Sequence, residues 1–386
     1  MKNNTDYTVI SDGAALDSFC QQLQNQTWIA LDTEFLREKT YYPKLCLVQI
    51  ATPELAACID PLAIDDLSPL LDLLYNRNIT KVMHSGRQDL EIFYNLRGEL
   101  PSPIFDTQVA APLIGLDEQL GYASLVQELL GVNLDKSHAR ADWTRRPLPA
   151  NQLQYAIEDV TYLAQIYPKL KSMLEERNRL QWLDSDFAAM TEPSLYQNPP
   201  ETAWLRVKQA NKLRPQQLSV LQALASWREI TAQQQDLPRG WLCKDEVLID
   251  ICRQLPDKVQ ELAHIRGLTE GFVRRHGQAL VELIHTAKSQ PPVPLPDYER
   301  KQKLSPADFA LVDALQAIVS LTAADFELHP NLLATRKMLE QFLANPSSSA
   351  LEHGWRKQVL GDLLISFLRG DIMLGCHAKQ LTLYDH

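Results

Sequence analysis

The sequence lacks any apolar run long enough to cross a membrane. A membrane-spanning helix needs roughly 20 consecutive apolar residues, and no stretch of the 386 residues approaches that length. Residues 1–6 also lack the apolar core of a secretory signal peptide. We therefore expect no membrane association and a cytoplasmic location.

Cysteine is scarce, and its spacing gives no sign of a zinc site or a disulfide framework. None of the six cysteines forms a Cys-x-x-Cys pair, and they are not concentrated in one short segment. Zinc sites and disulfide-rich secreted domains show one of these two patterns. We therefore interpret the cysteines as buried thiols.

The chain also lacks the excess of positive charge that is typical of nucleic-acid-binding proteins, since its net charge is −10. The charge is unevenly distributed. Residues 1–203 contain 28 acidic and 16 basic residues, residues 204–288 contain 9 and 13, and residues 289–386 contain 11 and 9. A basic middle segment in an acidic chain indicates that the segments have different functions.

Two polar, proline-rich stretches divide the chain. Residues 191–202 and 289–306 interrupt the apolar periodicity, and the second contains Pro291-Pro292-Val293-Pro294-Leu295-Pro296, which favours an extended polyproline II spacer. The domains predicted from these boundaries are residues 1–190, 204–288 and 306–375.

The first segment has the pattern of a mixed α/β sheet. Its β-rich runs predict strands at 28–32, 46–51, 56–60 and 81–84, the first three in an antiparallel meander. Helical spacing is expected at 67–74 and 89–96. The two later segments show helical spacing with no convincing strand, so each is interpreted as a small helical bundle.

Five residues of the first segment fall into three spaced motifs. Asp32 and Glu34 are two apart in a strand pattern, so both side chains point to one face. Tyr155 and Asp159 are four apart in a helical pattern, where they are neighbours. Asp89 opens the helix that follows a predicted strand. Clustered carboxylates repel one another unless a cation lies among them, and their hard oxygens suit Mg²⁺ or Mn²⁺.

Taken singly, each motif has an ordinary structural explanation. An Asp-x-Glu pair at the end of a strand is commonly a solvated turn, and Asp89 could simply stabilise the start of its helix. Tyr155 and Asp159 could be a half-buried tyrosine beside a surface acid. His84 is interpreted as a structural residue and not as a metal ligand. The metal-site hypothesis therefore depends on the motifs occurring together, in this order.

Together the three motifs resemble those of the DEDDy exonucleases, a family with a ribonuclease H-like fold. The motifs are Asp32-x-Glu34, His84 with Asp89, and Tyr155 with Asp159. Further likeness at 41–50, 105–111 and 136–148 narrows the resemblance to the bacterial ribonuclease D family and covers essentially the whole first domain.

The resemblance implies a role for each residue. In that family the counterparts of Asp32, Glu34, Asp89 and Asp159 hold two divalent metal ions, and the counterpart of Tyr155 positions the attacking water. It implies metal-dependent release of nucleoside 5′-monophosphates from the 3′ end of RNA. The expected partners are RNA 3′ ends, above all those of transfer RNA precursors, and we expect a monomer.

Three residues of the first domain are candidates for substrate contact. Lys136 and Arg146 could bind a phosphate, and Trp143 could stack on a base, as recurs in single-strand binders. The same residues could instead hold a loop over the active site. Asp106-Thr107 is expected to cap the helix that follows it.

The middle segment resembles an HRDC domain, a helical module that implies auxiliary contact with nucleic acid or protein. The likeness of the last segment is thinner and includes Gly354-Trp355-Arg356, which we interpret as a second, diverged HRDC domain. The expected fold is thus an α/β ribonuclease H-like exonuclease domain followed by two small all-α HRDC-type helical bundles.

Two alternatives to the exoribonuclease stay open. The same carboxylates serve 3′→5′ DNA exonucleases, and the sequence does not identify a residue that contacts the ribose 2′-hydroxyl. The second alternative is a noncatalytic RNA-binding adaptor with a vestigial nuclease fold. The intact set of acidic residues argues against the adaptor.

Overall fold

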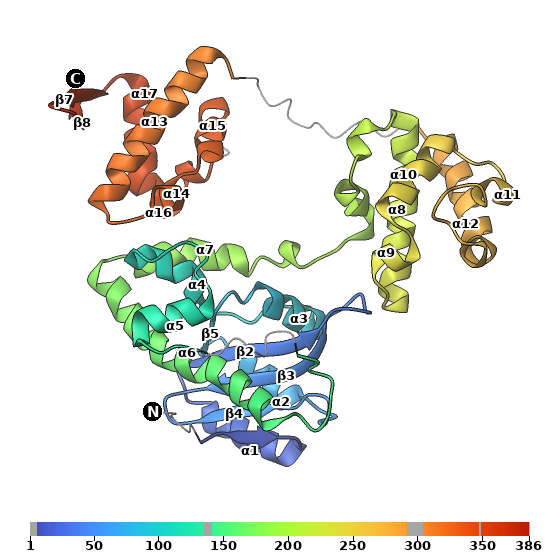
Figure 1. Ribbon diagram of the computed structural model, residues 1–386, viewed down its shortest axis with the longest axis horizontal. Coiled ribbons are helices and arrows are strands. Elements are labelled where there is room, and N and C mark those ends of the chain that lie inside the picture. The colour runs from blue at the N-terminus through green and yellow to red at the C-terminus, as the bar shows by residue number, and fades with distance from the viewer. Residues whose placement is uncertain (1–5, 135–140, 292–303, 347–348, 386) are drawn as a thin grey trace. The chain divides into compact units, whose positions relative to one another are not determined.

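The structure is a computed structural model that describes residues 6–134, 141–291, 304–346 and 349–385. The chain divides into two compact units (Figure 1). The first comprises residues 1–35, 45–195 and 302–386, and the second comprises residues 36–44 and 196–301. The proline-rich spacer predicted at 289–306 lies largely outside the described residues.

The first unit is built on a six-stranded sheet with the strand order β1-β4-β3-β2-β5-β6. Strand β3 is antiparallel to β4, whereas β1 is parallel to β4 and β5 is parallel to both β2 and β6. The predicted mixed α/β sheet is confirmed, and the sequence missed only the short outer strands β1 and β6. The strands are β1 (Thr8–Ile10), β2 (Trp28–Leu36), β3 (Lys44–Ala51), β4 (Ala56–Ile59), β5 (Thr80–Met83) and β6 (Ile104–Asp106).

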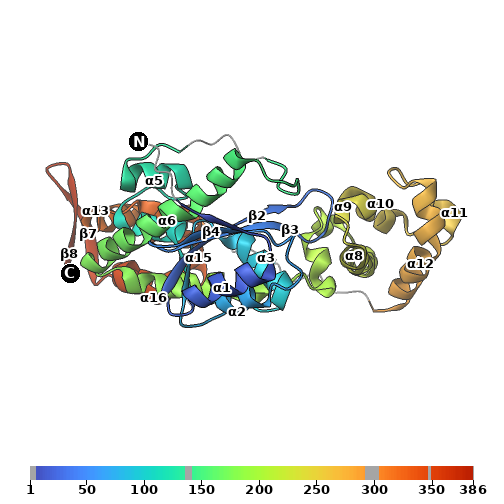
Figure 2. The same ribbon diagram turned by 90° about the horizontal axis from the view of Figure 1, so that it is seen from below.

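Helices cover both faces of this sheet. Helices α1 and α2 pack against each other on one side, and α5 and α6 do so on the other (Figure 2). The helices predicted at 67–74 and 89–96 are confirmed as α2 and α3. Helix α3 ends at Gly98, whose φ of 76° is readily adopted by glycine. The helices are α1 (Gly13–Leu23), α2 (Ser68–Leu74), α3 (Arg87–Arg97), α4 (Thr107–Ala110), α5 (Tyr122–Leu130), α6 (Ala150–Glu176) and α7 (Leu183–Met190).

The C-terminal segment is a helical bundle that packs within the first unit. Arg179, just after α6, donates to the Leu113 carbonyl at 2.7 Å and to the Phe326 carbonyl at 2.6 Å. The Trp182 and Trp355 rings stack with their centroids 4.6 Å apart. The helices of the segment are α13 (Pro306–Asp325), α14 (Pro330–Leu333), α15 (Arg336–Ala344), α16 (Gly354–Arg356) and α17 (Asp362–Arg369).

The expectation that the last segment contains no strand was wrong. Strands β7 (Ile372–His377) and β8 (Gln380–Asp385) form an antiparallel hairpin. Its two connecting residues, Ala378 and Lys379, have φ values of 48° and 66°. Two-residue turns of this kind usually carry Asn-Gly or Asp-Gly, so Ala-Lys gives no turn signal in the sequence.

Within the described residues, α13 alone has the length and composition of a membrane-spanning helix. Its contacts explain this composition. The helix packs against α14 and α15, and it buries Val312, Leu315, Ile318 and Val319 in the bundle. An apolar face of this kind is what a core helix presents to its neighbours.

The second unit is an all-α bundle, as predicted. Its core gathers apolar side chains from every long helix, among them Leu221, Leu248 and Ile284. The buried Glu229 carboxylate accepts a hydrogen bond from the Tyr41 hydroxyl and forms an ion pair with Arg239 at 2.8 Å. Residues 36–44 therefore belong to this unit. The helices are α8 (Pro215–Gln235), α9 (Arg239–Leu242), α10 (Asp245–Gln254), α11 (Val259–Leu262) and α12 (Glu270–Ser289).

Candidate active site

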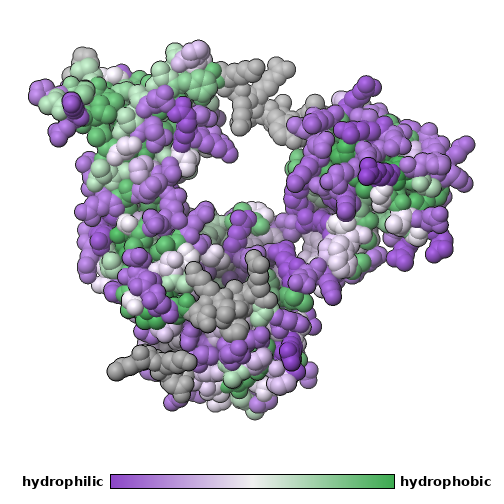
Figure 3. Space-filling view, viewed as in Figure 1, coloured by the Kyte–Doolittle hydropathy of each residue, from purple (hydrophilic) through white to green (hydrophobic). Residues whose placement is uncertain are grey.

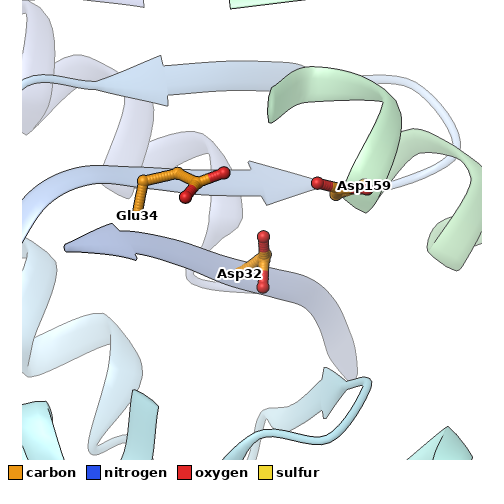
Figure 4. A group of neighbouring side chains, drawn as sticks. All are labelled: Asp32, Glu34 and Asp159. Carbon is orange, nitrogen blue, oxygen red and sulfur yellow. The ribbon is translucent and has the colours of Figure 1, made fainter. Parts of the chain in front are cut away.

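Three carboxylates converge where α6 crosses the sheet. Asp32 and Glu34 lie on β2 and point to the same face, as the spacing predicted, and Asp159 projects from α6. One oxygen of each lies within 4.8 Å of the others. Figure 4 shows the three side chains directed toward a common space. Packing of α6 against the sheet thus brings Asp159 close to two residues that are more than 120 positions away in the sequence.

The fourth predicted carboxylate, Asp89, is linked to the same strand through Thr33. Asp89 lies in the first turn of α3 and is 7% exposed. The Thr33 hydroxyl donates to Asp89 Oδ1. Thr33 sits between Asp32 and Glu34, so a single tripeptide supplies two carboxylates and orients a third. The sequence analysis did not recognise this role of Thr33.

Burial raises the pKa of all four carboxyls, and for Asp32 and Glu34 the charges of other carboxylates in the cluster raise it further. Burial raises the pKa of Asp32 well above its usual range, and the charges of Asp89, Asp159 and Glu34 raise it further. Burial raises the pKa of Glu34 to about 9, and the charges of Asp159 and Asp89 add to this effect. Burial raises the pKa of Asp159 to about 7, and that of Asp89 to about 6, where the Thr33 bond opposes it. A cluster of hard, anionic oxygens of this kind fits a divalent cation such as Mg²⁺.

The metal-free protein is expected to lose stability as the pH rises from about 4 to about 9. The folded-state pKa of each of these carboxyls lies above its unfolded value. The unfolded chain therefore releases its protons first as the pH rises, which favours unfolding across this window. Melting temperatures in EDTA, measured at intervals of pH, check the expectation.

The matched variant for this experiment is Glu34→Gln. It removes the carboxyl whose pKa is raised to about 9, so the decline between pH 7 and 9 should become shallower. Added Mg²⁺ should stabilise the wild-type protein because it binds only the folded state. The effect should be largest at the upper end of the pH range, where the carboxyls are deprotonated and can bind the cation. A wild-type curve that is flat or rising in EDTA would contradict the expectation.

Tyr155 lies on α6 one turn before Asp159 and is half-buried. Burial raises the pKa of its phenol above the usual value, and the charges of Asp159, Glu34 and Asp32 add to this effect. The hydroxyl therefore stays protonated at neutral pH and can act as a hydrogen-bond donor.

Tyr155→Phe is expected to lower kcat by roughly 10²-fold, because it leaves the ring in place and removes the hydroxyl that the family resemblance assigns to positioning the water. KM should change little, since the carboxylates remain. Single-turnover and steady-state kinetics on an RNA oligonucleotide separate the two effects. Tyr162→Phe, also on α6, is the matched control, and kinetics of Tyr155→Phe equal to this control would make Tyr155 a structural residue.

Asp106 and Thr107 form a hydrogen-bonded frame beside the carboxylates. Asp106 caps α4 by accepting from the Gln108 amide at 2.8 Å, which confirms the predicted helix cap. The same carboxylate accepts from the backbone amides of Ser85 and Gly86 at 3.0 and 2.8 Å. Asp106 therefore fixes the turn that leads into α3 and so into Asp89.

Tyr122 fixes the part of α6 that carries Asp159, a function that the sequence did not reveal. Its hydroxyl lies 3.1 Å from the Glu158 carbonyl and 2.5 Å from the Asp159 carbonyl. Burial raises the pKa of this phenol well above its usual value, so it remains a donor. Tyr122 begins α5, and no local pattern links it to a helix that starts 28 residues later.

Of the three residues predicted to contact substrate, Arg146 and Trp143 lie among the described residues, and both contact other groups of the protein. The Arg146 guanidinium binds both oxygens of Asp60, at 2.5 and 2.7 Å, and the Cys46 carbonyl at 2.7 Å. Trp143 is 3% exposed, and its ring centroid lies 6.3 Å from that of Tyr155. These contacts favour the interpretation that Arg146 and Trp143 hold the loop. Lys136 lies outside the described residues.

Comparison with known proteins gives concordant matches along the chain. The 3′-5′ exonuclease domain family matches residues 7–175, and the HRDC domain family matches residues 217–284. Ribonuclease D of Zymomonas mobilis is 40% identical over 382 residues, and ribonuclease D of Sphingobium indicum is 42% identical over 386, each match covering 98% of both chains. The crystal structure of Escherichia coli RNase D, an exoribonuclease involved in structured RNA processing, matches with a TM-score of 0.82 at 35% identity, covering 95% of this chain and 99% of that one.

Proposed function

Because the chain belongs to the ribonuclease D family and is a metal-dependent 3′→5′ exoribonuclease, we propose that its carboxylate cluster holds two divalent ions. The observation that carries the proposal is the convergence of Asp32, Glu34 and Asp159, with Asp89 tied to the same strand. All four carboxylates would hold the ions. Mg²⁺ and Mn²⁺ both accept such oxygen ligands.

The residues around the cluster have distinct tasks in the hydrolysis. Divalent ions held by the four carboxylates would supply an acidified water and stabilise charge on the phosphate oxygens. Tyr155 donates its hydroxyl proton in a hydrogen bond that orients the water for attack. Thr33 holds Asp89, and Tyr122 holds the backbone at Asp159. Water adds to phosphorus and the bond to the 3′ oxygen breaks, which releases a nucleoside 5′-monophosphate and leaves a 3′-hydroxyl on the shortened RNA.

The cavity beside the carboxylates supports action on one terminal nucleotide at a time. Its volume is about 430 Å³, and its lining includes Asp32, Glu34, His84, Tyr155 and Asp159. A pocket of this size matches a small-molecule site, and a mononucleotide fits that range. The E. coli relative acts in structured RNA processing. We extend this to the present chain and propose 3′-extended transfer RNA precursors as substrates.

We propose that the protein works in the cytoplasm, where its RNA substrates are made. We also propose that it works as a monomer, because a single chain supplies all four carboxylates and Tyr155.

The second unit supports a role in holding RNA. A cavity of about 340 Å³ on this unit is lined by five basic residues, Arg206, Lys208, Arg228, Arg239 and Lys244, together with the acidic Glu229, Asp245 and Glu246. The face of the unit that Figure 3 shows carries mostly hydrophilic side chains. Basic side chains near a surface favour phosphate contacts that do not depend on base sequence. We propose that residues 204–288 bind RNA and that residues 306–375 form a second HRDC-like domain.

The proposed function is tested by a time course on 3′-extended transfer RNA and on single-stranded DNA of matched sequence, each with Mg²⁺, Mn²⁺ or EDTA. RNA should shorten stepwise from its 3′ end with either metal and stay intact in EDTA. Equal shortening of DNA would favour the DNA exonuclease. Intact RNA in metal, despite measurable binding, would favour the noncatalytic adaptor.

A further inference from the structure

Arg146 uses all the hydrogen-bond donors of its guanidinium within the protein. The group has five N–H donors. Its Nε and Nη2 donate to the two carboxylate oxygens of Asp60 at 2.5 and 2.7 Å. Nη2 also donates to the Cys46 carbonyl at 2.7 Å, and Nη1 donates to the carbonyls of Trp143 and Arg145 at 2.8 and 2.9 Å. Because all five donors are engaged, the side chain has none left for a phosphate of the RNA.

The partners of Arg146 lie on the sheet and fix the loop to it. Asp60 follows β4 directly and is 7% exposed, and its backbone amide donates to the Ile10 carbonyl on β1 at 2.8 Å. Cys46 lies on β3. Strand β3 is the neighbour of β2, the strand that carries two of the catalytic carboxylates. The loop that contains Arg146 is therefore anchored beside the catalytic strand.

The same loop places the Trp143 ring against Tyr155. Trp143 is 3% exposed, and its ring centroid lies 6.3 Å from that of Tyr155, with an angle of 32° between the ring planes. Separations of about 4.5–7 Å are typical of interacting aromatic pairs. Since the carbonyl of Trp143 accepts from Arg146, the ion pair with Asp60 also holds the backbone of the tryptophan.

The loop also leads directly into the helix that carries Tyr155. Helix α6 begins at Ala150, after Pro149, and no side chain among the described residues caps it. The first turn of a helix that lacks such a cap is prone to fray. The Tyr122 hydroxyl binds the α6 backbone one turn beyond Tyr155, at Asp159. The loop before Pro149 is thus placed to support Tyr155 from its N-terminal side.

We propose that the ion pair of Asp60 with Arg146 holds Trp143 against the Tyr155 ring and thereby directs the Tyr155 hydroxyl at the attacking water. The inference rests on the proposed function, in which Tyr155 orients that water. It adds two positioning residues, Arg146 and Trp143. Both act through Tyr155, which distinguishes them from residues that bind the phosphates of the substrate.

The first test measures the single-turnover rate of RNA cleavage by the full-length protein with Mg²⁺, together with the dissociation constant of the RNA. Trp143→Leu should lower the rate roughly threefold to tenfold, because it removes the ring against which Tyr155 packs. The affinity for RNA should change little, since the carboxylates remain. Trp143→Phe keeps an aromatic ring and should restore most of the rate.

Arg146→Gln removes the charge that pairs with Asp60 and should lower the rate by a similar factor, again with little change in affinity. Arg145→Gln is the matched control, because Arg145 is exposed in the same loop and its side chain forms no ion pair with the described residues. This control should keep the wild-type rate. If Trp143→Leu does not fold, as judged from its melting temperature, Arg146→Gln and Trp143→Phe carry the test.

A double-mutant cycle with Tyr155→Phe separates positioning from a merely structural effect. If Trp143 and Arg146 act through the Tyr155 hydroxyl, their substitutions should change the rate of the Tyr155→Phe protein by a factor of only about 1. A loss of stability, in contrast, would be much the same in both backgrounds. Loss of the rate effect in the Tyr155→Phe background therefore marks a positioning role.

The inference is overturned if Arg146→Gln keeps the wild-type rate, or if its full effect persists in the Tyr155→Phe background. Weaker RNA binding at an unchanged rate would also overturn it and would assign Arg146 to phosphate contact. These results leave the exoribonuclease function intact, whereas failure of the wild type to cleave RNA would contradict that function.

A readout that needs no cleavage decides the inference in that last case. In fluorine NMR of protein labelled with fluorotyrosine, the Tyr155 signal is the one that is missing in Tyr155→Phe. This signal should shift in Arg146→Gln, because the ring is no longer held in one position, and it should not shift in Arg145→Gln. A Tyr155 signal that is the same in Arg146→Gln and in the wild type overturns the inference.

Discussion

Asp32→Asn is expected to lower the rate of RNA cleavage by about 10³-fold or more, with the protein still folded. Metal-assisted charge stabilisation contributes several kcal/mol, and about 4 kcal/mol corresponds to a factor of roughly 10³. Asp32 lies within reach of Glu34 and Asp159, and its pKa is raised by all three neighbouring carboxylates. Asparagine preserves the shape of the side chain but removes the charge that a cation would need.

The same substitution should not lower the melting temperature of the metal-free protein. It removes one negative charge from a cluster in which each charge opposes the others, so repulsion in the folded state falls. Asp17→Asn is the matched control, since Asp17 is an exposed carboxylate on α1. Normal turnover by a folded Asp32→Asn protein would refute the metal site, and a collapse of stability would show that Asp32 is mainly structural.

The pairing of side chains within each motif could be predicted because it depends only on local geometry, whereas the joining of the motifs in one site was inferred from their resemblance to a known family. A strand places Asp32 and Glu34 on one face, and a helix places Tyr155 beside Asp159, whatever the rest of the chain does. Thr33 and Tyr122 were missed for the opposite reason. Thr33 bonds to a residue 56 positions away and Tyr122 to one 37 positions away. Such partners are determined by tertiary packing, which a single sequence does not display.

The interior of the sheet contains a fully buried lysine, a residue type that is almost always exposed. Lys81 is completely buried on β5, in a run that the sequence marked only as a strand. Its ammonium group donates to the carbonyls of Asn76, Ile79 and Ser102 at 3.0, 2.6 and 2.9 Å. Burial lowers its pKa to about 7. The partners are backbone atoms of two loops, so side-chain patterns could not identify them.

The packing of the C-terminal bundle against the nuclease domain could not be predicted from the sequence either. The boundaries at proline-rich stretches separated residues 306–375 from residues 1–190, but they carry no information on which surfaces meet. Arg179, Trp182 and Trp355 form the contacts that join these segments in one unit. Arg179 also lies 5.5 Å from the Trp182 ring. The apolar and aromatic contacts suggest that the bundle contributes to the stability of the nuclease domain.

Trp355→Ala is therefore expected to destabilise the first unit by about 3–5 kcal/mol. Trp355 is 4% exposed and stacks on Trp182 with an angle of 3° between the rings. The Arg356 guanidinium lies 4.3 Å from the centre of the Trp355 ring, and Trp355 Nε1 lies 3.4 Å from Asp186 Oδ2. Truncation would leave a cavity at the contact and would remove a partner from each of these groups.

Urea unfolding followed by far-ultraviolet circular dichroism measures the loss, with limited proteolysis as a second readout. Trp241→Ala is the matched control, because Trp241 is 62% exposed on α9 in the other unit and should change stability by less than about 0.5 kcal/mol. If the bundle stabilises the nuclease domain, Trp355→Ala should shift the unfolding of that domain and expose cleavage sites in α7 and α13. Equal midpoints for the two variants would mean that the stacked tryptophans contribute little and that the bundle and the nuclease domain are stable independently of each other.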